Sequence, residues 1–186
     1  MKYAKFYESD YPESNTSEKK VGELLKNLSS SWTILHSVKV HDPEVEKLTN
    51  TEIDFLLIHP SYGFLQIEVK GRGYETNSNG NWFIKKGPHK EKVNSPLDLL
   101  GEKQSKIIKT FLYHNRTIKG VELLNVKVPI MSIIFWTDLK REDFPISEVS
   151  KVNSYFIEDI FVPIEKLEEN LIKKLEKHIK TDTQIK

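Results

Sequence analysis

Three charged residues lie at two strand-like segments with a spacing that suits metal-assisted chemistry. Asp54 belongs to the apolar run 53–58, whereas Glu68 and Lys70 lie in and directly after the run 64–69. Carboxylate oxygens are ligands that Mg²⁺ takes from proteins, and such an ion polarises phosphoryl oxygens and makes hydroxide available near neutral pH. A neighbouring lysine can orient the attacking water or stabilise developing negative charge. If folding unites them, these residue types indicate metal-dependent chemistry at a phosphate ester.

The turn sequence 59–63 decides whether the charges meet. A turn centred on Ser61 pairs Asp54 with Glu68, whose Cβ atoms then lie about 4.5–5.5 Å apart on one face. Lys70 shares that face, because side chains alternate along a strand. A slip of one residue would disperse the set, and a salt-bridge cluster on a solvated sheet face is the alternative interpretation. The opposite face would carry only apolar residues that require a core: Ile53, Phe55, Leu57, Leu65, Ile67 and Val69.

The remaining segments predict helices around a sheet. Helical spacing of apolar residues predicts helices over 16–28, 96–113 and 164–179, and strand-forming composition predicts strands over 32–40, 53–58, 64–69, 82–84 and 126–136. The second helix has an apolar face of Leu99, Leu100, Ile107, Ile108, Phe111 and Leu112. This order predicts a mixed sheet flanked by helices. We expect an N-terminal arm over residues 1–16, a core over 17–140, and a C-terminal segment over 141–186 whose amphipathic helix packs on the core.

Composition excludes several classes of protein. The 186 residues include no cysteine, which excludes disulfides and thiolate zinc sites. No uncharged apolar run approaches the roughly 18 residues that cross a bilayer, so we expect a cytoplasmic protein without a membrane partner. The chain has no Walker-type phosphate loop and no Gly-x-Ser-x-Gly elbow, and its histidines lack zinc-site spacing.

Positive charge is concentrated in the middle of the chain. The net charge is +1, but residues 70–109 hold nine Lys or Arg and four acids. Such a stretch is compatible with contact to a phosphate backbone, although a solvated lysine-rich helix and loop has the same composition. Arg72, Lys85, Lys86 and Gln104 are the candidate nucleic-acid contacts.

The hairpin sequence resembles a known family. The residues that carry the likeness are Thr51-Glu52-Ile53-Asp54-Phe55-Leu56-Leu57-Ile58, the turn with Gly63, and Ile67-Glu68-Val69-Lys70-Gly71. They resemble the nuclease-related (NERD) domain of the PD-(D/E)xK nuclease superfamily, over roughly residues 17–136. The resemblance implies an α/β, restriction-endonuclease-like fold with a mixed β-sheet flanked by helices. It also implies a Mg²⁺-dependent nuclease, with Mn²⁺ as a substitute, that hydrolyses DNA phosphodiester bonds.

The resemblance carries over four residues one by one. Glu18, Asp54, Glu68 and Lys70 match catalytic positions, and the three acids among them match metal ligands. For Glu18, the match is the pattern Glu18-x-x-Val21, but Asn15-x-x-Glu18 also resembles a helix capping box. The family's glutamine shortly after Pro96 is absent, and Gln104 is the nearest glutamine.

Two other functions stay open at this point. One is a nucleic-acid-binding module on the same fold without turnover. The other is a protein-interaction domain in which the apolar segment 155–163 docks on a partner chain or on a second copy in a homodimer.

Overall fold

A six-stranded mixed sheet carries the molecule. The computed structural model describes residues 3–8, 15–40, 51–71, 73–77, 79–119, 129–143 and 154–183. The strand order is β1-β2-β3-β4-β8-β9. The pairs β2–β3 and β3–β4 are antiparallel, whereas the pairs β1–β2, β4–β8 and β8–β9 are parallel. The strands are β1 (Lys5–Tyr7), β2 (Thr33–Val40), β3 (Thr51–His59), β4 (Gly63–Lys70), β8 (Ile130–Trp136) and β9 (Ser154–Tyr155).

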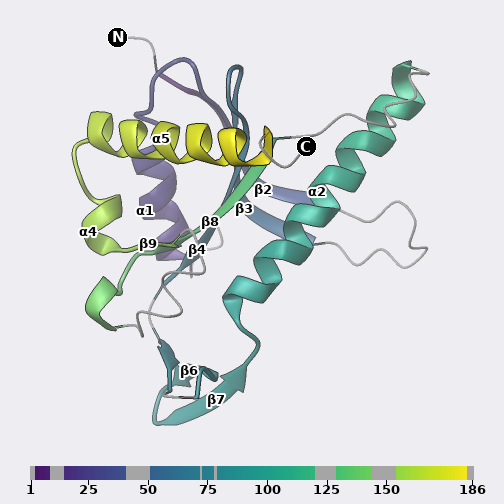
Figure 1. Cartoon of the computed structure of the whole chain (residues 1–186). Helices are drawn as coiled ribbons and strands as arrows, with labels where there is room; N and C mark the ends of the chain where they lie inside the picture. The colour runs from purple at the N-terminus through teal and green to yellow at the C-terminus, as the bar shows by residue number, and fades with distance from the viewer. Residues whose placement is uncertain are drawn as a thin grey trace.

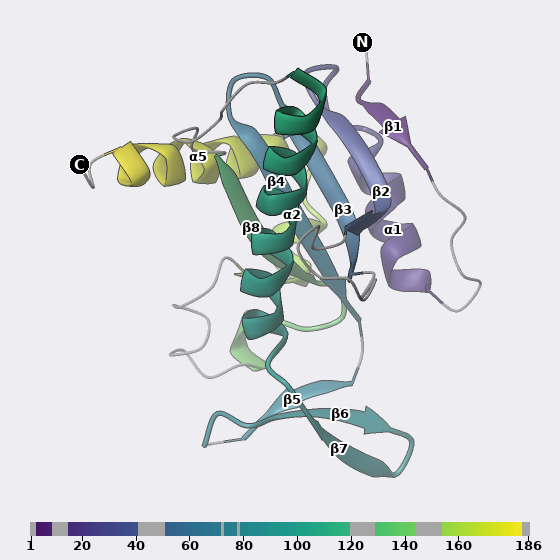
Figure 2. The ribbon, with the colours of Figure 1, turned by 90° about the vertical axis from the view of Figure 1, so that its right-hand side faces the viewer.

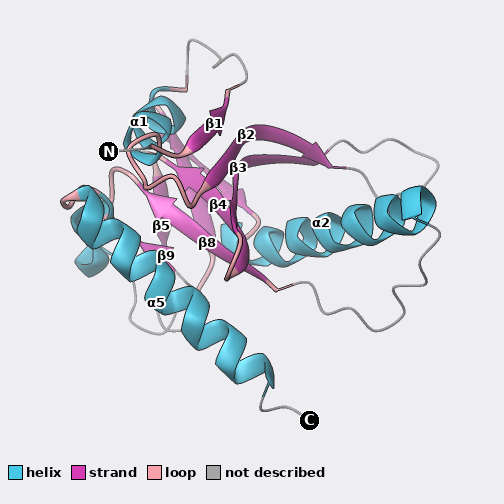
Figure 3. Ribbon diagram, turned by 90° about the horizontal axis from the view of Figure 1, so that it is seen from above, coloured by secondary structure: helices cyan, strands magenta, loops and turns pink. Residues whose placement is uncertain are grey.

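Helices cover both faces of this sheet. Helices α1 (Thr16–Leu25) and α5 (Ile164–Thr183) lie on one side and α2 (Pro96–Lys119) crosses the other, as Figures 1 and 3 show. The expected mixed α/β fold of the restriction-endonuclease type is thereby confirmed. The helices predicted over 96–113 and 164–179 are a little longer than expected, and the one predicted over 16–28 is shorter. Within the described residues, no helix is long and apolar enough to cross a bilayer.

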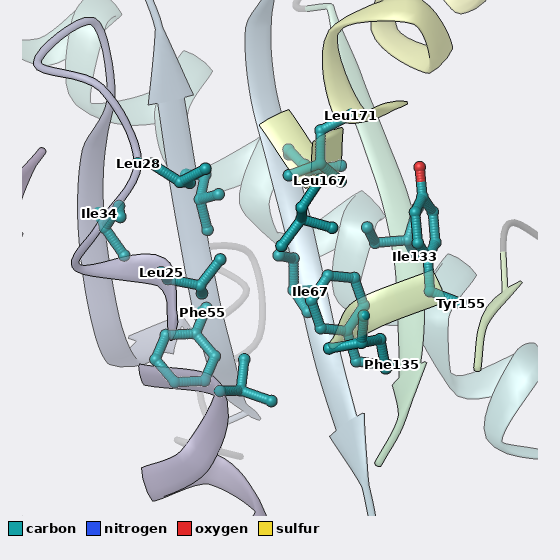
Figure 4. Packing of buried hydrophobic residues seen from close by; sticks show 14 of the residues in the cluster. Leu25, Leu28, Ile34, Phe55, Ile67, Ile133, Phe135, Tyr155, Leu167 and Leu171 are labelled. Atoms are coloured by element: carbon teal, nitrogen blue, oxygen red, sulfur yellow. The ribbon is translucent and has the colours of Figure 1, made fainter. Parts of the chain in front are cut away.

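The central hairpin has the predicted register. Phe55 pairs with Ile67, Leu57 with Leu65, and His59 with Gly63, which centres the turn on Ser61. One face of this hairpin packs against α1 and α5, and Figure 4 shows the side chains that meet there. Every labelled residue in that view, from Leu25 to Leu171, is at most 4% exposed.

Ile53 departs from the predicted face. Five of the six apolar residues assigned to that face belong to the core beneath α1 and α5, whereas Ile53 packs with Leu56 and Ile107 in the cluster beneath α2. The regular β3–β4 pairing ends at Phe55, and Ser37 on the neighbouring strand has a φ of 55°. Because the backbone is irregular at this level, strict alternation of side chains does not extend to Ile53.

Several short elements were missed or misjudged. Strand β1 falls within the predicted N-terminal arm, yet it pairs with β2, and the N–H of Ala4 donates to the carbonyl of Leu28. Leu99, assigned to the apolar face of α2, is 39% exposed. Within the predicted docking segment 155–163, Tyr155 and Phe156 are buried core residues, so that interpretation is wrong for them. Strand β1 has three residues and β9 has two, which is too few for an alternating pattern to be recognised in the sequence.

A second, smaller sheet follows the central hairpin in the chain. Its order is β5 (Tyr74–Thr76), β6 (Trp82–Lys86) and β7 (His89–Val93), all antiparallel. It extends beyond the end of the main sheet, below the N-terminal end of α2, in Figure 2. Trp82 stacks on Trp136 of β8 with ring centroids 5.6 Å apart, which attaches the small sheet to the large one.

The C-terminal helix completes the core. Leu167, Leu171 and Leu175 of α5 are at most 1% exposed against the sheet. Glu168 on the same helix accepts hydrogen bonds from Ser29 N–H at 3.2 Å and from Trp32 Nε1–H at 3.0 Å. Short α4 (Ile157–Ile160) precedes α5 and also buries Ile160.

The turn of the central hairpin generates a stability prediction. Gly63 has a φ of 82°, and a Cβ there would lie 2.4 Å from the carbonyl oxygen of Pro129. Gly63→Ala should lower the free energy of unfolding by the roughly 1–2 kcal/mol of a left-handed residue, and by more because backbone must move. Gly87→Ala is the matched control, since Gly87 has a φ of 64° with nothing within 4 Å. Urea denaturation measures both, and equal losses would contradict the role assigned to Pro129.

Candidate functional site

Asp54 lies where the β3–β4 ladder opens. The last paired residues are Phe55 and Ile67, and beyond them the N–H of Val69 donates to Asp54 Oδ2 at 2.7 Å. A side-chain carboxylate thus accepts a hydrogen bond that a backbone carbonyl would accept in a continued ladder. This contact holds the Asp54 carboxylate beside the segment of β4 that contains Glu68 and Lys70.

Glu68 is a buried carboxylate with a lysine on each oxygen. Lys70 Nζ lies 2.7 Å from Glu68 Oε1, and Lys103 of α2 contacts Oε2. The side chains of Glu68, Lys70 and Lys103 are only 7%, 19% and 16% exposed. Removing charges from water is costly unless they are paired, and each oxygen of this buried carboxylate has the ammonium group of a lysine beside it.

Lys103 is a site residue that the sequence reasoning missed. Leu100 and Ile107 of α2 are each 4% exposed, and positions three and four residues apart share one face of a helix. Lys103 lies between them on that inward face. A lysine inside an apolar stripe requires an anion on the opposing surface, and this signal was available before the structure.

Gln104 docks α2 on the sheet. Its side-chain amide N–H donates to the carbonyl of Ile130 at 3.0 Å, and Ser132 Oγ lies 3.0 Å from its amide oxygen. Ser132 Oγ lies equally close to the amide oxygen of Gln66, and its single proton can serve only one of them. The amide N–H of Gln104 is therefore engaged in helix–sheet packing and its amide oxygen lies beside Ser132, which leaves its candidate role as a nucleic-acid contact unsupported.

Glu18 combines the two roles that the sequence left open. Asn15 caps α1, because its side chain accepts a hydrogen bond from the N–H of Glu18 at 3.3 Å and its amide group contacts Glu18 Oε1. The other carboxylate oxygen lies 3.5 Å from Nε2 of the buried His36. Burial raises the pKa of Glu18, and Glu52 and Glu68 raise it further. Glu18 thus takes part in the helix cap and also faces Asp54 and Glu68, and these three acids together with Lys70 and Lys103 form the acidic cluster.

Burial, followed by repulsion among the carboxylates, raises the pKa values of two acids in this site. Burial and the neighbouring Glu68 raise the pKa of Asp54 to about 7, against the opposing effect of Lys70 and the hydrogen bond from Val69. Burial alone would lower the pKa of Lys70, but Glu68 and Asp54 outweigh it and the net pKa is raised. Lys70 is therefore an ammonium ion at neutral pH, and a further cation near Asp54 would relieve the repulsion.

The carboxylate oxygens of Glu18, Asp54 and Glu68 are ligands of the type that a hard divalent cation prefers. Three carboxylates in mutual electrostatic contact supply the oxygen ligands that Mg²⁺ prefers. In the described parts of the chain, however, no three acidic or imidazole side chains converge closely enough to form a ready metal cluster. The contacts explain why: Val69 holds Asp54, Asn15 holds Glu18, and the lysines hold Glu68. An ion would have to displace at least one lysine from Glu68.

The other candidate contacts lie apart from this cluster. Lys85 and Lys86 project from the small sheet, 53% and 66% exposed, and form surface ion pairs with Glu75 and Glu91. Arg72 lies outside the described residues. The small sheet follows β4, whose last residue is Lys70, and it lies beyond the end of the main sheet (Figure 2).

The electrostatics predict that Asp54 reduces stability. Asp54→Asn keeps an oxygen acceptor for Val69 but removes the repelling charge. At pH 8 in EDTA it should raise the free energy of unfolding on the order of 1–3 kcal/mol, because one unit of pKa shift corresponds to about 1.4 kcal/mol and the amide accepts more weakly. Glu142→Gln, on a side chain that is 76% exposed, is the control. A less stable Asp54→Asn protein would contradict this account.

Comparison with known proteins now gives the context of the cluster. The family model of the nuclease-related domain (NERD) matches residues 13–137, about two thirds of the chain. No curated protein and no solved structure matches the chain at a significant level. The matched region contains α1 with Glu18, the β3–β4 hairpin, the small sheet, α2 and β8. The chain therefore belongs to the nuclease-related domain family.

Proposed function

We propose that this protein is a metal-dependent nuclease that hydrolyses DNA phosphodiester bonds. Asp54, Glu68 and Glu18 would hold Mg²⁺ or Mn²⁺, and Lys70 would be the catalytic lysine. The observation that carries this proposal is the gathering of two strand carboxylates and a lysine at the open end of the β3–β4 ladder. Membership of a nuclease-related family supports the same reaction class.

The metal would meet a site that already has excess negative charge. When bound, such an ion supplies a Lewis acid for phosphoryl oxygen and makes hydroxide available from water near neutral pH. Asp54 is suited to hold it because its carboxylate is fixed by the N–H of Val69 and is destabilised as an anion by Glu68. Glu18 is suited to hold the ion for the same reason, since burial and other acids raise its pKa and a nearby cation would stabilise its charged form.

The two lysines would act on the substrate phosphate. Without substrate, each lysine forms an ion pair with one carboxylate oxygen of Glu68. If the carboxylates held a cation, either ammonium group could contact the negative charge that develops on the phosphate, where positive charge stabilises a transition state most. Lys70 is at the strand end and remains beside Asp54, so we assign it the orientation of the attacking water.

A second candidate function has an observation in its favour. Lys70 and Lys103 already neutralise Glu68, in the manner of a substitute for the metal. A protein that bound DNA without cutting it would need no cation among its carboxylates. Such a protein would bind DNA equally well in EDTA and in Mg²⁺, and would never cleave it.

Cleavage assays test the proposed nuclease. Asp54→Ala and Lys70→Ala should each lower Mg²⁺-dependent DNA cleavage by about 10²–10³-fold, the loss typical of a removed electrostatic stabiliser. Glu23→Gln is the control, because Glu23 is a 59% exposed acid on the same helix as Glu18. Circular dichroism checks folding. Undiminished cleavage by either purified alanine variant would reject the assignment.

Binding assays test the lysines of the small sheet. Lys85→Gln combined with Lys86→Gln should weaken DNA binding and reduce the slope of log affinity against log salt concentration by about 1–2, since each phosphate contact contributes about 0.9. The turnover number at saturating DNA should be unchanged, because these side chains lie apart from Glu68. Lys166→Gln on α5, with a side chain 55% exposed, is the control. An unchanged salt slope would remove the small sheet from the DNA-binding surface.

A further inference from the structure

A pocket outside the family match gathers positive charge. It is a cavity of about 440 Å³ bounded by the 3₁₀ helix η1 (Arg141–Asp143), β9, α4 and α5. Its wall includes the cations Arg141, Lys173 and Lys174 and one acid, Asp159. All of these residues follow position 137, where the nuclease-related match ends. The pocket is thus a feature of the C-terminal segment.

This pocket lies on the other side of the sheet from the carboxylate of Glu68. Tyr155 of β9, which lines it, belongs to the core beneath α1 and α5. Its partner Phe135 on β8 pairs in turn with Val69 of β4, and these three side chains share one face. Glu68, one residue before Val69, points to the opposite face, which α2 covers. A ligand in the pocket would not touch Glu68.

Lys174 is the cation of this pocket that contacts an aromatic ring in place of a carboxylate. Arg141 pairs with Asp159, and Lys173 lies 2.5 Å from Glu169. Lys174 instead lies over the ring of Tyr155, 4.4 Å from its centroid, and forms no ion pair with a carboxylate of the described residues. Burial lowers the pKa of Lys174, and the neighbouring cations Arg141 and Lys177 lower it further, against the opposing effect of Asp159. A half-buried ammonium in this condition is stabilised by any anion that reaches it.

Neutral donors complete the wall. Ser154 Oγ accepts a hydrogen bond from Trp136 Nε1–H at 3.2 Å, which leaves its own hydroxyl proton to donate. Asn170 adds a side-chain amide, and the 49% exposed guanidinium of Arg141 has N–H groups beyond those on Asp159. A planar guanidinium with an ammonium and a hydroxyl suits the several oxygens of a phosphate.

We propose that this pocket binds a small phosphate monoester through Lys174, Arg141 and Lys173. Its volume exceeds what a bare phosphate fills and falls in the range of about 300–1,000 Å³ that is usual for small-molecule sites. The ring of Tyr155 is covered by Lys174, so the organic part of the ligand would occupy the open side of the pocket. The proposal does not depend on the nuclease activity, because the two sites share no residue.

Calorimetry and thermal shift on the full chain in EDTA test the proposal. The probes are inorganic phosphate and deoxyadenosine 5′-monophosphate, with deoxyadenosine and KCl of equal ionic strength as blanks. Both phosphates should bind and raise the melting temperature, and the blanks should not. Tighter binding of the monoester than of inorganic phosphate is expected, whereas binding of inorganic phosphate alone would overturn the monoester assignment.

Variants locate the binding. Lys174→Gln and Arg141→Gln should each weaken monophosphate affinity by about tenfold or more, because hydrogen bonds to charged groups are the strong ones. Lys166→Gln on the same helix and Lys70→Gln in the acidic cluster should keep the affinity. Should Arg141→Gln fail to fold for want of the Asp159 contact, Lys174→Gln decides alone. Retained affinity in Lys174→Gln, or its loss in Lys70→Gln, would overturn the proposed site.

Discussion

The buried carboxylate of Glu68 constrains how the molecule is assembled. A charged side chain that is only 7% exposed needs partners of opposite charge, and Glu68 has one lysine from its own strand and one from α2 beside it. The Lys103 contact therefore fixes how α2 lies across the sheet, together with the amide contacts of Gln104 to Ile130 and Ser132. Packing and electrostatics are joined here, since the helix that covers the sheet also supplies charge to the site.

The ionised carboxylate of Asp54, next to Glu68, lowers the stability of the folded protein. An acid whose pKa is raised to about 7 by burial and by Glu68 opposes folding when it ionises. The structure tolerates this because the N–H of Val69 holds the carboxylate and because a large core surrounds the hairpin. Residues that are unfavourable for stability and yet fixed in place are typical of functional sites.

The C-terminal segment has two structural roles: it completes the main core and it forms a wall of the cationic pocket. Helix α5 contributes Leu167, Leu171 and Leu175 to the main core and ties itself to the α1–β2 turn through Glu168. Its outer side forms a wall of the cationic pocket with β9 and η1. The nuclease-related match stops before both features. The same helix is thus indispensable to the sheet it covers and presents a surface of a different chemical character.

The hairpin could be predicted from sequence because its information is local. The alternation of apolar residues and a short turn at Ser61 determine the register of β3 and β4, and hence that Asp54, Glu68 and Lys70 share a region. Helix periodicity likewise located α1, α2 and α5. The capping role of Glu18 was also legible, since Asn15 stands three residues before it.

What only the tertiary structure decided depends on contacts between distant segments. Lys103 meets Glu68 across 35 positions of sequence, and the cationic pocket unites Arg141 with Lys174 through strands and helices that no local pattern relates. Ile53 packs beneath α2 and not on the predicted face, at the level where Ser37 has an irregular backbone. Residues 5–7, predicted to lie in an N-terminal arm, form strand β1 by pairing with β2. Periodicity reports which side of an element is apolar, but the partner of that side is chosen by the packing of the whole chain.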